Sequence, residues 1–422
     1  MKLILKSAKI IDRNWEGGNE RVDIVIRNGK IEKIGKDLQI DGFKEIRSGN
    51  LHVSPGFVDI GAQIGEPGFE QRDDIHSISK AAMAGGYTAV SSFPNTNPVV
   101  QSKSEIAYLK NQTSDFLVDF HPIGAISHDT KGGDIAEIMD MQAHGAVGFS
   151  DGKYSIANSG LMMRALQYAK ACDGLIINHP NDAGIAEEGQ IHEGEVSVSL
   201  GLEGIPEMSE TMGLKRDLQL NQYVESKYCA HNISSADSTK LLKKERKHPE
   251  RKVWSTVNYM NLIFTDEDLK NFNVNLKVYP PLRSARDQRN LVRGLKEGTI
   301  DAITTGHTPL EEEHKKMSFA FASFGAIGLE TAFSALLSYA DDLSLETIID
   351  KLTWGPREVL QLPVYQINEG EKADLCIFDP DIEWNYTSDT IKSKSRNSPF
   401  VDKQLKGKVL AVINNNKVSY NN

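Results

Sequence analysis

Hydrophobic residues in the middle of the chain follow two alternating patterns. Short runs rich in β-branched and aromatic residues predict strands, and longer stretches with apolar residues three and four positions apart predict helices. The helical stretches include 76–85, 161–173, 235–247 and 285–298. Ser235 and Ser284 are candidate capping residues for two of them. The candidate strands are 53–63, 86–96, 116–127, 146–152, 174–180, 227–234, 252–260 and 301–309.

Eight strands alternating with helices over about 310 residues favour one architecture, a closed (β/α)₈ TIM barrel. An open doubly wound sheet is the alternative, but it usually has fewer strands and a phosphate-binding loop. No GxGxxG or Walker sequence follows any of the candidate strands. We therefore expect an α/β protein whose main domain, residues 54–365, is the barrel.

The two ends of the chain show a different pattern, with short β-rich runs separated by Gly and Asn. Residues 3–11 and 23–35 alternate as strands do, and Asn28-Gly29 stands where a tight hairpin needs positive φ. Residues 372–380 and 405–420 have the same character. Because neither end offers enough strands for its own core, residues 1–53 and 366–422 are expected to form one composite β-domain with the barrel inserted between them.

Composition and charge exclude several classes of function. The 422 residues carry 48 basic against 58 acidic side chains, a net charge of −10, with no long basic run. Nucleic acid and membrane surfaces are therefore not expected as partners. The three cysteines lie far apart in apolar contexts, which fits free thiols in a reducing compartment. The first 12 residues are too short and too charged for a signal segment, so the expected location is cytoplasmic.

Polar residues at the ends of the candidate strands are where a barrel would place its chemistry. A single histidine at such a position is more often structural, but three at the ends of strands 5, 6 and 8 would converge on one mouth and point to a metal site. Imidazoles with one carboxylate suit zinc or a similar divalent ion. The candidates are Asn95, His121, Asp151, His179, His231 and His307.

Arg283 follows a Pro-Pro turn, where its guanidinium could clamp a carboxylate. An ordinary surface arginine is an equally good interpretation of the same residues.

A set of motifs, in order along some 350 residues, resembles the type I dihydroorotases of the cyclic amidohydrolase superfamily. The motifs are PGFVDI, EPG, FPNTNP, HPND, IHEGEVSVSLGL, AHNISSA, FTDED, PPLRS, DAITTGHTP, FGAIGLETA, ADLCIFDP and KSRNSPF. The resemblance implies a metal-dependent barrel with a composite β-domain, in agreement with the pattern above. Family members reversibly cyclise carbamoyl aspartate to dihydroorotate in pyrimidine synthesis and often associate with aspartate carbamoyltransferase.

The departures from the family pattern fall in its catalytic set. Where the family ends strand 1 with His-x-His-x-Arg, this chain has Gly61 and Gln63 at the two histidine positions. After strand 4 the second aspartate of Asp-Asp-Gly bridges two metals in the family, and a gapless comparison puts Gly152 there, although a shifted loop would bring Asp151 into play. The family acid/base aspartate after strand 8 is Gly306.

Substrate contacts are also partly replaced. The last histidine of the family's strand-8 motif is Leu310, and the Asn before Pro-Pro-Leu-Arg is Tyr279. Asn95 and Arg283 match the family's substrate-binding positions, and His179 and His231 match two of its metal ligands. We regard these four, with Asp151 as a third metal ligand, as the remnant of a substrate and metal site.

The leading hypothesis is a dihydroorotase homologue without catalytic residues and without a cofactor. As partners we expect a second copy of the chain in a homodimer and, by family analogy, the catalytic chain of aspartate carbamoyltransferase, whose assembly this chain would support. The alternative is an active zinc-dependent cyclic amidohydrolase with one weakly bound zinc on His179 and His231 and a different acid/base, His307 or His121. A binding module that holds an acidic ligand on Arg283 and Asn95 is a third hypothesis.

Overall fold

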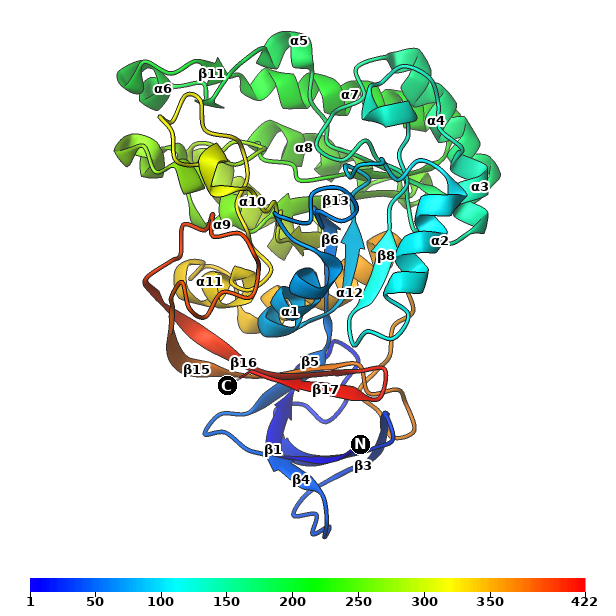
Figure 1. Ribbon diagram of the computed structural model, residues 1–422, viewed down its shortest axis with the longest axis vertical. Helices are drawn as coiled ribbons and strands as arrows, with labels where there is room; N and C mark the ends of the chain where they lie inside the picture. Colours follow the sequence, from blue (N-terminus) through cyan, green and yellow to red (C-terminus); the bar gives the residue numbers. More distant parts are fainter. Residues whose placement is uncertain (422) are drawn as a thin grey trace.

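Both ends of the chain lie in one eight-stranded sheet, which is stacked against a barrel (Figure 1). The computed structural model describes residues 1–421. The sheet order is β17-β16-β15-β5-β1-β2-β3, with β4 paired to β1. Its strands are β1 (Lys2–Ile10), β2 (Arg21–Arg27), β3 (Lys30–Gly35), β4 (Lys44–Ile46), β5 (His52–Pro55), β15 (Leu375–Tyr386), β16 (Lys403–Asn414) and β17 (Lys417–Tyr420).

Strand β5 joins the N-terminal and C-terminal parts of this sheet. It runs parallel to β1 and antiparallel to β15, with Ser54 opposite Cys376. The β2–β3 hairpin turns at Asn28 and Gly29, whose φ values of 50° and 77° confirm the predicted tight turn. The domain limits at residues 53/54 and 365/366 stay a prediction.

Seven parallel strands form the barrel wall in two sheets, β6-β7-β8 and β9-β12-β13-β14. A parallel bridge residue, Phe149, pairs with Gly124 after β8 and with Ile176 in β9, which links the two sheets on one side. On the other side the Gln63 N–H donates to the His307 carbonyl at 2.9 Å. The strands are β6 (Phe57–Ala62), β7 (Tyr87–Ser92), β8 (Asp119–Pro122), β9 (Leu175–Asn178), β12 (Lys227–Ala230), β13 (Val253–Asn258) and β14 (Ala302–Thr304).

The fourth predicted strand, 146–152, is reduced to the bridge at Phe149. Gly145 and Gly152 at its two ends have φ of 100° and 63°, outside the extended region, so regular pairing cannot extend beyond the central residues. The eight predicted segments still follow one another around the barrel in their order along the chain. Apolar side chains of β6, β9 and β14, among them Val58, Ile60, Ile177 and Ala302, fill the interior.

Helices alternate with the strands, as the pattern predicted. Ser235 and Ser284 cap α8 and α10 by accepting the backbone N–H of Ser238 and Asp287. No helix within residues 1–421 has the length and apolar character to cross a membrane. The helices are α1 (Ile75–Gly85), α2 (Lys103–Gln112), α3 (Ile138–Ala143), α4 (Ser159–Ala171), α5 (Ala183–Ala186), α6 (Glu195–Leu200), α7 (Glu207–Val224), α8 (Ala236–Glu245), α9 (Met260–Ile263), α10 (Ala285–Lys296), α11 (Ala332–Tyr339) and α12 (Leu345–Leu360).

Short elements complete the chain: the strands β10 (Ile191–His192) and β11 (Gly204–Ile205), which pair in parallel, and 3₁₀ turns at His128–Thr130, Pro249–Arg251, Asp266–Asn271, Val274–Leu276 and Glu312–His314.

The segment 391–400 returns from the sheet and packs on the barrel through buried carboxylates. Glu330 accepts the backbone N–H groups of Lys392 and Ser393. Asp73 accepts the Ser393 hydroxyl, the Lys394 N–H at 2.8 Å and the His307 ring. We call this contact, centred on Asp73 and Glu330, the C-terminal seam.

Candidate active site

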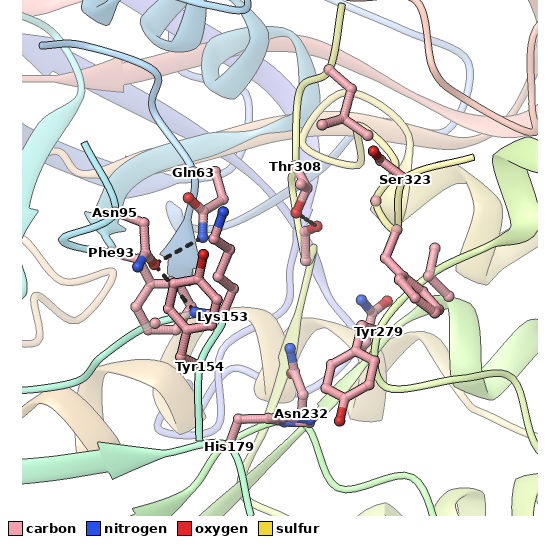
Figure 2. Close-up of a pocket in the computed structure, with 18 of the residues that line it drawn as sticks. Gln63, Phe93, Asn95, Lys153, Tyr154, His179, Asn232, Tyr279, Thr308 and Ser323 are labelled. Atoms are coloured by element: carbon pink, nitrogen blue, oxygen red, sulfur yellow. Dashed lines mark hydrogen bonds between the residues drawn. The ribbon is translucent and has the colours of Figure 1, made fainter. Parts of the chain in front are cut away.

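A cavity of about 680 Å³ lies at the carboxyl ends of the barrel strands, where barrel enzymes have their active sites (Figure 2). Because successive parallel strands end on the same rim, their last residues meet in this one space. The strand-end residues that line it are Gly61, Phe93, Asn95, Gly152, His179, His231, Asn258 and Gly306.

His179 and His231 lie side by side in the cavity, as the sequence predicted. The His179 Nδ1 donates to the His231 carbonyl at 3.0 Å, and the His231 Nδ1 lies 3.1 Å from the Thr256 hydroxyl. Burial lowers the pKa of His179, and burial together with the neighbouring His179 lowers the pKa of His231 to about 3. Both imidazoles are therefore neutral at pH 7.

Aromatic rings pack against both imidazoles. The ring of Tyr279 meets His179 edge to face with centroids 4.9 Å apart, and Phe93 meets His231 in the same way at 5.1 Å. Tyr279 replaces the asparagine that the family pattern leads one to expect, and its ring occupies part of the space between the strands. Edge-to-face contacts of this kind are typical of aromatic rings packed in a protein core.

Asp151 is not brought to the two histidines. Its carboxylate accepts the backbone N–H groups of Ile126 and Ser127, both at 2.9 Å, and the Ser127 hydroxyl. Burial nevertheless raises the pKa of Asp151. The carboxylate fixes the loop after β8, and the geometry gives no support to its predicted use as a third metal ligand.

His307 follows β14 as predicted, but its side chain does not line the cavity. Its Nε2 lies 3.3 Å from the Asp73 carboxylate, and its Nδ1 accepts the backbone N–H groups of Gly328 and Leu329. His121 also lies outside the cavity lining. The expectation that three strand-end histidines converge is therefore corrected to two, and neither candidate for the substitute acid/base reaches the site.

Arg283 lies in a buried network beside the cavity. Its Nε donates to the Ser234 hydroxyl at 2.8 Å and its terminal nitrogen to the Ile205 carbonyl at 3.1 Å, close to His192 and 3.9 Å from Glu210. The guanidinium does not line the cavity, so the geometry gives no support to the prediction that it clamps a carboxylate there. Asn95 does line the cavity, where its Oδ1 accepts the Lys153 N–H at 3.2 Å.

Neighbouring side chains fill the space beside the three glycines at family ligand or acid/base positions. A Cβ at Gly61 would lie 2.4 Å from the Phe93 ring, one at Gly152 1.8 Å from the Asn95 Oδ1, and one at Gly306 2.0 Å from the Asn258 Nδ2. All three glycines also have positive φ. Any side chain there would require both backbone strain and movement of a neighbour.

Sequence reasoning missed Asn232 and Asn258, which line the floor of the cavity. The strand-end rule applied to 252–260 points to Asn258, since it is the last residue of β13. Asn232 directly follows His231 and carried no separate signal.

The fold is that of the hydantoinases. The L-hydantoinase (dihydropyrimidinase) of Arthrobacter aurescens superposes with a TM-score of 0.87 at 23% identity, over 99% of this chain and 95% of that one. The dihydropyrimidinase of Brevibacillus agri gives a TM-score of 0.83 at 19% identity, over 100% of this chain and 95% of that one.

Within this fold the chain belongs to the dihydroorotase family. A relative named dihydroorotase from Caldicellulosiruptor saccharolyticus is 37% identical over 99% of this chain and 98% of its own length. A second, from Pelotomaculum thermopropionicum, is 37% identical over 98% and 97%. A family model described as dihydro-orotase-like matches residues 50–238.

The family implies zinc, and the donor set of this chain does not fit it. Within the described residues 1–421, no group of three or more His, Cys, Asp or Glu side chains could hold a metal ion. His179 and His231 supply two nitrogens, whereas catalytic zinc sites use three protein ligands. Gly61, Gln63, Gly152 and Gly306 supply no carboxylate or imidazole.

Proposed function

We propose that this chain is a catalytically silent member of the dihydroorotase family that supports the assembly of aspartate carbamoyltransferase in pyrimidine synthesis. The observation that carries the first part is the filled space beside Gly61, Gly152 and Gly306, where Phe93, Asn95 and Asn258 occupy the places that ligand side chains would need. At these three positions a ligand side chain would collide with a neighbouring side chain, although the cavity of about 680 Å³ itself is open.

The chemistry supports the same conclusion. Opening a cyclic amide at neutral pH needs an activated water and a group that moves its proton. A bound zinc lowers the pKa of water from 15.7 to about 7, and a positioned acid/base contributes a factor of about 10²–10⁴. With Gly306 at the acid/base position and only two imidazoles at the family's ligand positions, those positions supply neither contribution.

The role in assembly rests on the family association with aspartate carbamoyltransferase, and the homodimer on the same analogy. A chain that keeps its fold without its chemistry contributes its surface. Mixing the purified chain with the catalytic chain of aspartate carbamoyltransferase at micromolar concentration should give one larger species on size exclusion. Two separate peaks with unchanged transcarbamoylase activity would contradict the proposal.

An active enzyme with a single zinc is the alternative, favoured only by the two imidazoles that line the same cavity. It requires one equivalent of zinc and a ring-opening rate that falls in His179→Ala. Metal content and turnover of dihydroorotate distinguish it from the silent protein, whatever the result of the assembly experiment.

A further inference from the structure

A second cavity, of about 510 Å³, lies where the chain after β1 meets the helices α10 and α12. We call it the junction cavity. It shares no lining residue with the candidate active site. Because Gly298 leads into β14 at Ala302, it lies near the amino end of that strand, whereas the candidate active site lies at the carboxyl ends. Ligand cavities often lie where two parts of a fold meet.

The wall of the junction cavity contains buried aliphatic side chains and two indole rings. Leu295 of α10 and Ile349 of α12 are 1% and 2% exposed. Trp15 and Trp354 also line the cavity, and both are half-buried. The Trp354 ring is held in place because its N–H donates to the Asp12 carboxylate at 2.9 Å. Such a wall suits the flat apolar body of a ligand, such as an aromatic ring.

The three acidic side chains of the lining have partners within the chain. Both oxygens of Asp12 accept N–H groups. Asp350 accepts the Arg13 Nε at 2.8 Å. Glu346 is exposed at the edge of the cavity, where its carboxylate lies 3.9 Å from the Lys9 ammonium. Carboxylates that are already paired in this way do not call for a cationic ligand.

Two lysines of the lining, Lys351 and Lys296, differ from these carboxylates. Within residues 1–421 the Lys351 ammonium donates no hydrogen bond, and the one carboxylate within 4 Å is that of Asp350, 3.8 Å away and already bonded to Arg13. The Lys351 side chain is only 12% exposed. Lys296, at the end of α10, is exposed. Because a largely buried charge normally has hydrogen-bond partners, an anion in the cavity would supply the acceptor that Lys351 lacks.

We propose that the junction cavity binds a small aromatic carboxylate. The carboxylate accepts from the Lys351 ammonium, Lys296 adds positive charge at the edge, and the ring of the ligand lies against Trp15 and Trp354. The proposal is independent of the proposed function, because the two cavities are separate. A ligand held in this way contacts both the chain after β1 and α12, so it ties the sheet to the barrel.

Phenylacetate and phenylacetamide are suitable probes, since they share a ring and differ in charge. Ligand-observed NMR titration of the full chain should give a dissociation constant for phenylacetate at least tenfold below that for phenylacetamide, because hydrogen bonds between charged groups are the stronger ones. Lys351→Met keeps the apolar stem and removes the ammonium, so it should weaken phenylacetate at least tenfold and leave phenylacetamide unchanged. Trp15→Leu should weaken both probes alike.

Lys80→Met, at an exposed lysine of α1, is the matched control and should bind phenylacetate as the unaltered chain does. Lys351→Arg keeps the charge and should retain most of the binding, which separates loss of charge from altered packing. Melting curves establish that each variant is folded. Should Lys351→Met not fold, Lys296→Met at its exposed position replaces it and should weaken phenylacetate but not phenylacetamide.

Three results would overturn the proposal: no saturable binding of phenylacetate, equal affinity for the two probes, or binding that neither lysine variant changes. The last result would mean that the probe binds elsewhere, for example in the candidate active site. Zinc content and dihydroorotate turnover are measured separately and test only the proposed function.

Discussion

The C-terminal seam and the barrel mouth lie at the ends of the same strands, yet their buried polar groups are arranged in opposite ways. At the seam, Asp73 accepts from His307, Ser393 and the Lys394 backbone, and these contacts outweigh the effect of burial and lower its pKa. At the mouth, four side-chain nitrogens have no hydrogen-bond partner within residues 1–421: the Nε2 atoms of His179 and His231 and the Nδ2 atoms of Asn232 and Asn258. The polar groups of the seam are paired as in a structural network. Those of the mouth are left free, as on a surface that fold stability does not require.

The largest expected effect is at the seam. Asp73→Ala leaves the buried His307 ring, the Ser393 hydroxyl and a backbone N–H without their acceptor. Breaking such a buried network costs about 3–5 kcal/mol, which denaturant unfolding measures. Asp389→Ala, at an exposed aspartate, is the control and should change the free energy of unfolding by less than about 0.5 kcal/mol. A loss for Asp73→Ala no larger than that for Asp389→Ala would show that the Asp73 network does not stabilise the fold, and the seam would then not differ from the mouth.

The next effect concerns pH at the mouth. His231 is held neutral in the folded protein with a pKa of about 3, against 6.5 when unfolded. The unfolded chain therefore takes up the proton first as the pH falls below 6.5, and stability is lost from there toward pH 3. Between pH 7 and pH 5 this group alone lowers the free energy of unfolding by about 2 kcal/mol.

His231→Gln removes this titration and should flatten the pH dependence by that amount, in the presence of EDTA. Parallel curves for the variant and the unaltered chain would show that His231 is charged or accessible in the folded state.

A smaller effect is expected at Gly306, which stands at the family's acid/base position. Gly306→Ala places a Cβ 2.0 Å from the Asn258 Nδ2 and at a φ of 55°, and the left-handed backbone alone costs about 1–2 kcal/mol. Asn258→Ala should relieve the clash and leave only the backbone cost. The double variant should thus be more stable than the sum of the two single effects predicts. Simple additivity would mean that Asn258 does not fill the space.

The smallest effect is expected for Gln63→Leu, which removes a polar side chain from the mouth. The Gln63 Nε2 makes one long contact, 3.4 Å to the Asn95 Oδ1. We expect a change of less than about 0.5 kcal/mol in the free energy of unfolding. A loss comparable with that of Asp73→Ala would show that the mouth is part of the stabilising network.

The order of strands and helices could be predicted from the sequence because hydrophobic periodicity is a local property. The same reasoning placed Asn95, His179 and His231 in the cavity. It failed at His307, whose side chain bonds Asp73 in the C-terminal seam while its neighbours Gly306 and Thr308 line the cavity. The strand β14 ends at Thr304 and Gly306 has a positive φ, so the direction of the His307 side chain does not follow from the strand pattern.

Asp151 and Arg283 could not be placed from sequence for a different reason. Each is satisfied by partners distant in the chain, Asp151 by the backbone at 126–127 and Arg283 by Ser234 and Ile205. Such contacts are properties of the assembled fold. The filling of the space beside Gly61 and Gly306 by Phe93 and Asn258 is likewise visible only in three dimensions.

The proposed function requires that the mouth neither holds zinc nor opens the dihydroorotate ring. The direct measurement is the zinc content of the purified chain after loading with zinc and gel filtration, with dihydroorotate turnover measured on the same sample. We expect well under one equivalent of zinc and no rate above the uncatalysed reaction. One bound equivalent, with turnover that disappears in His179→Ala, would contradict it.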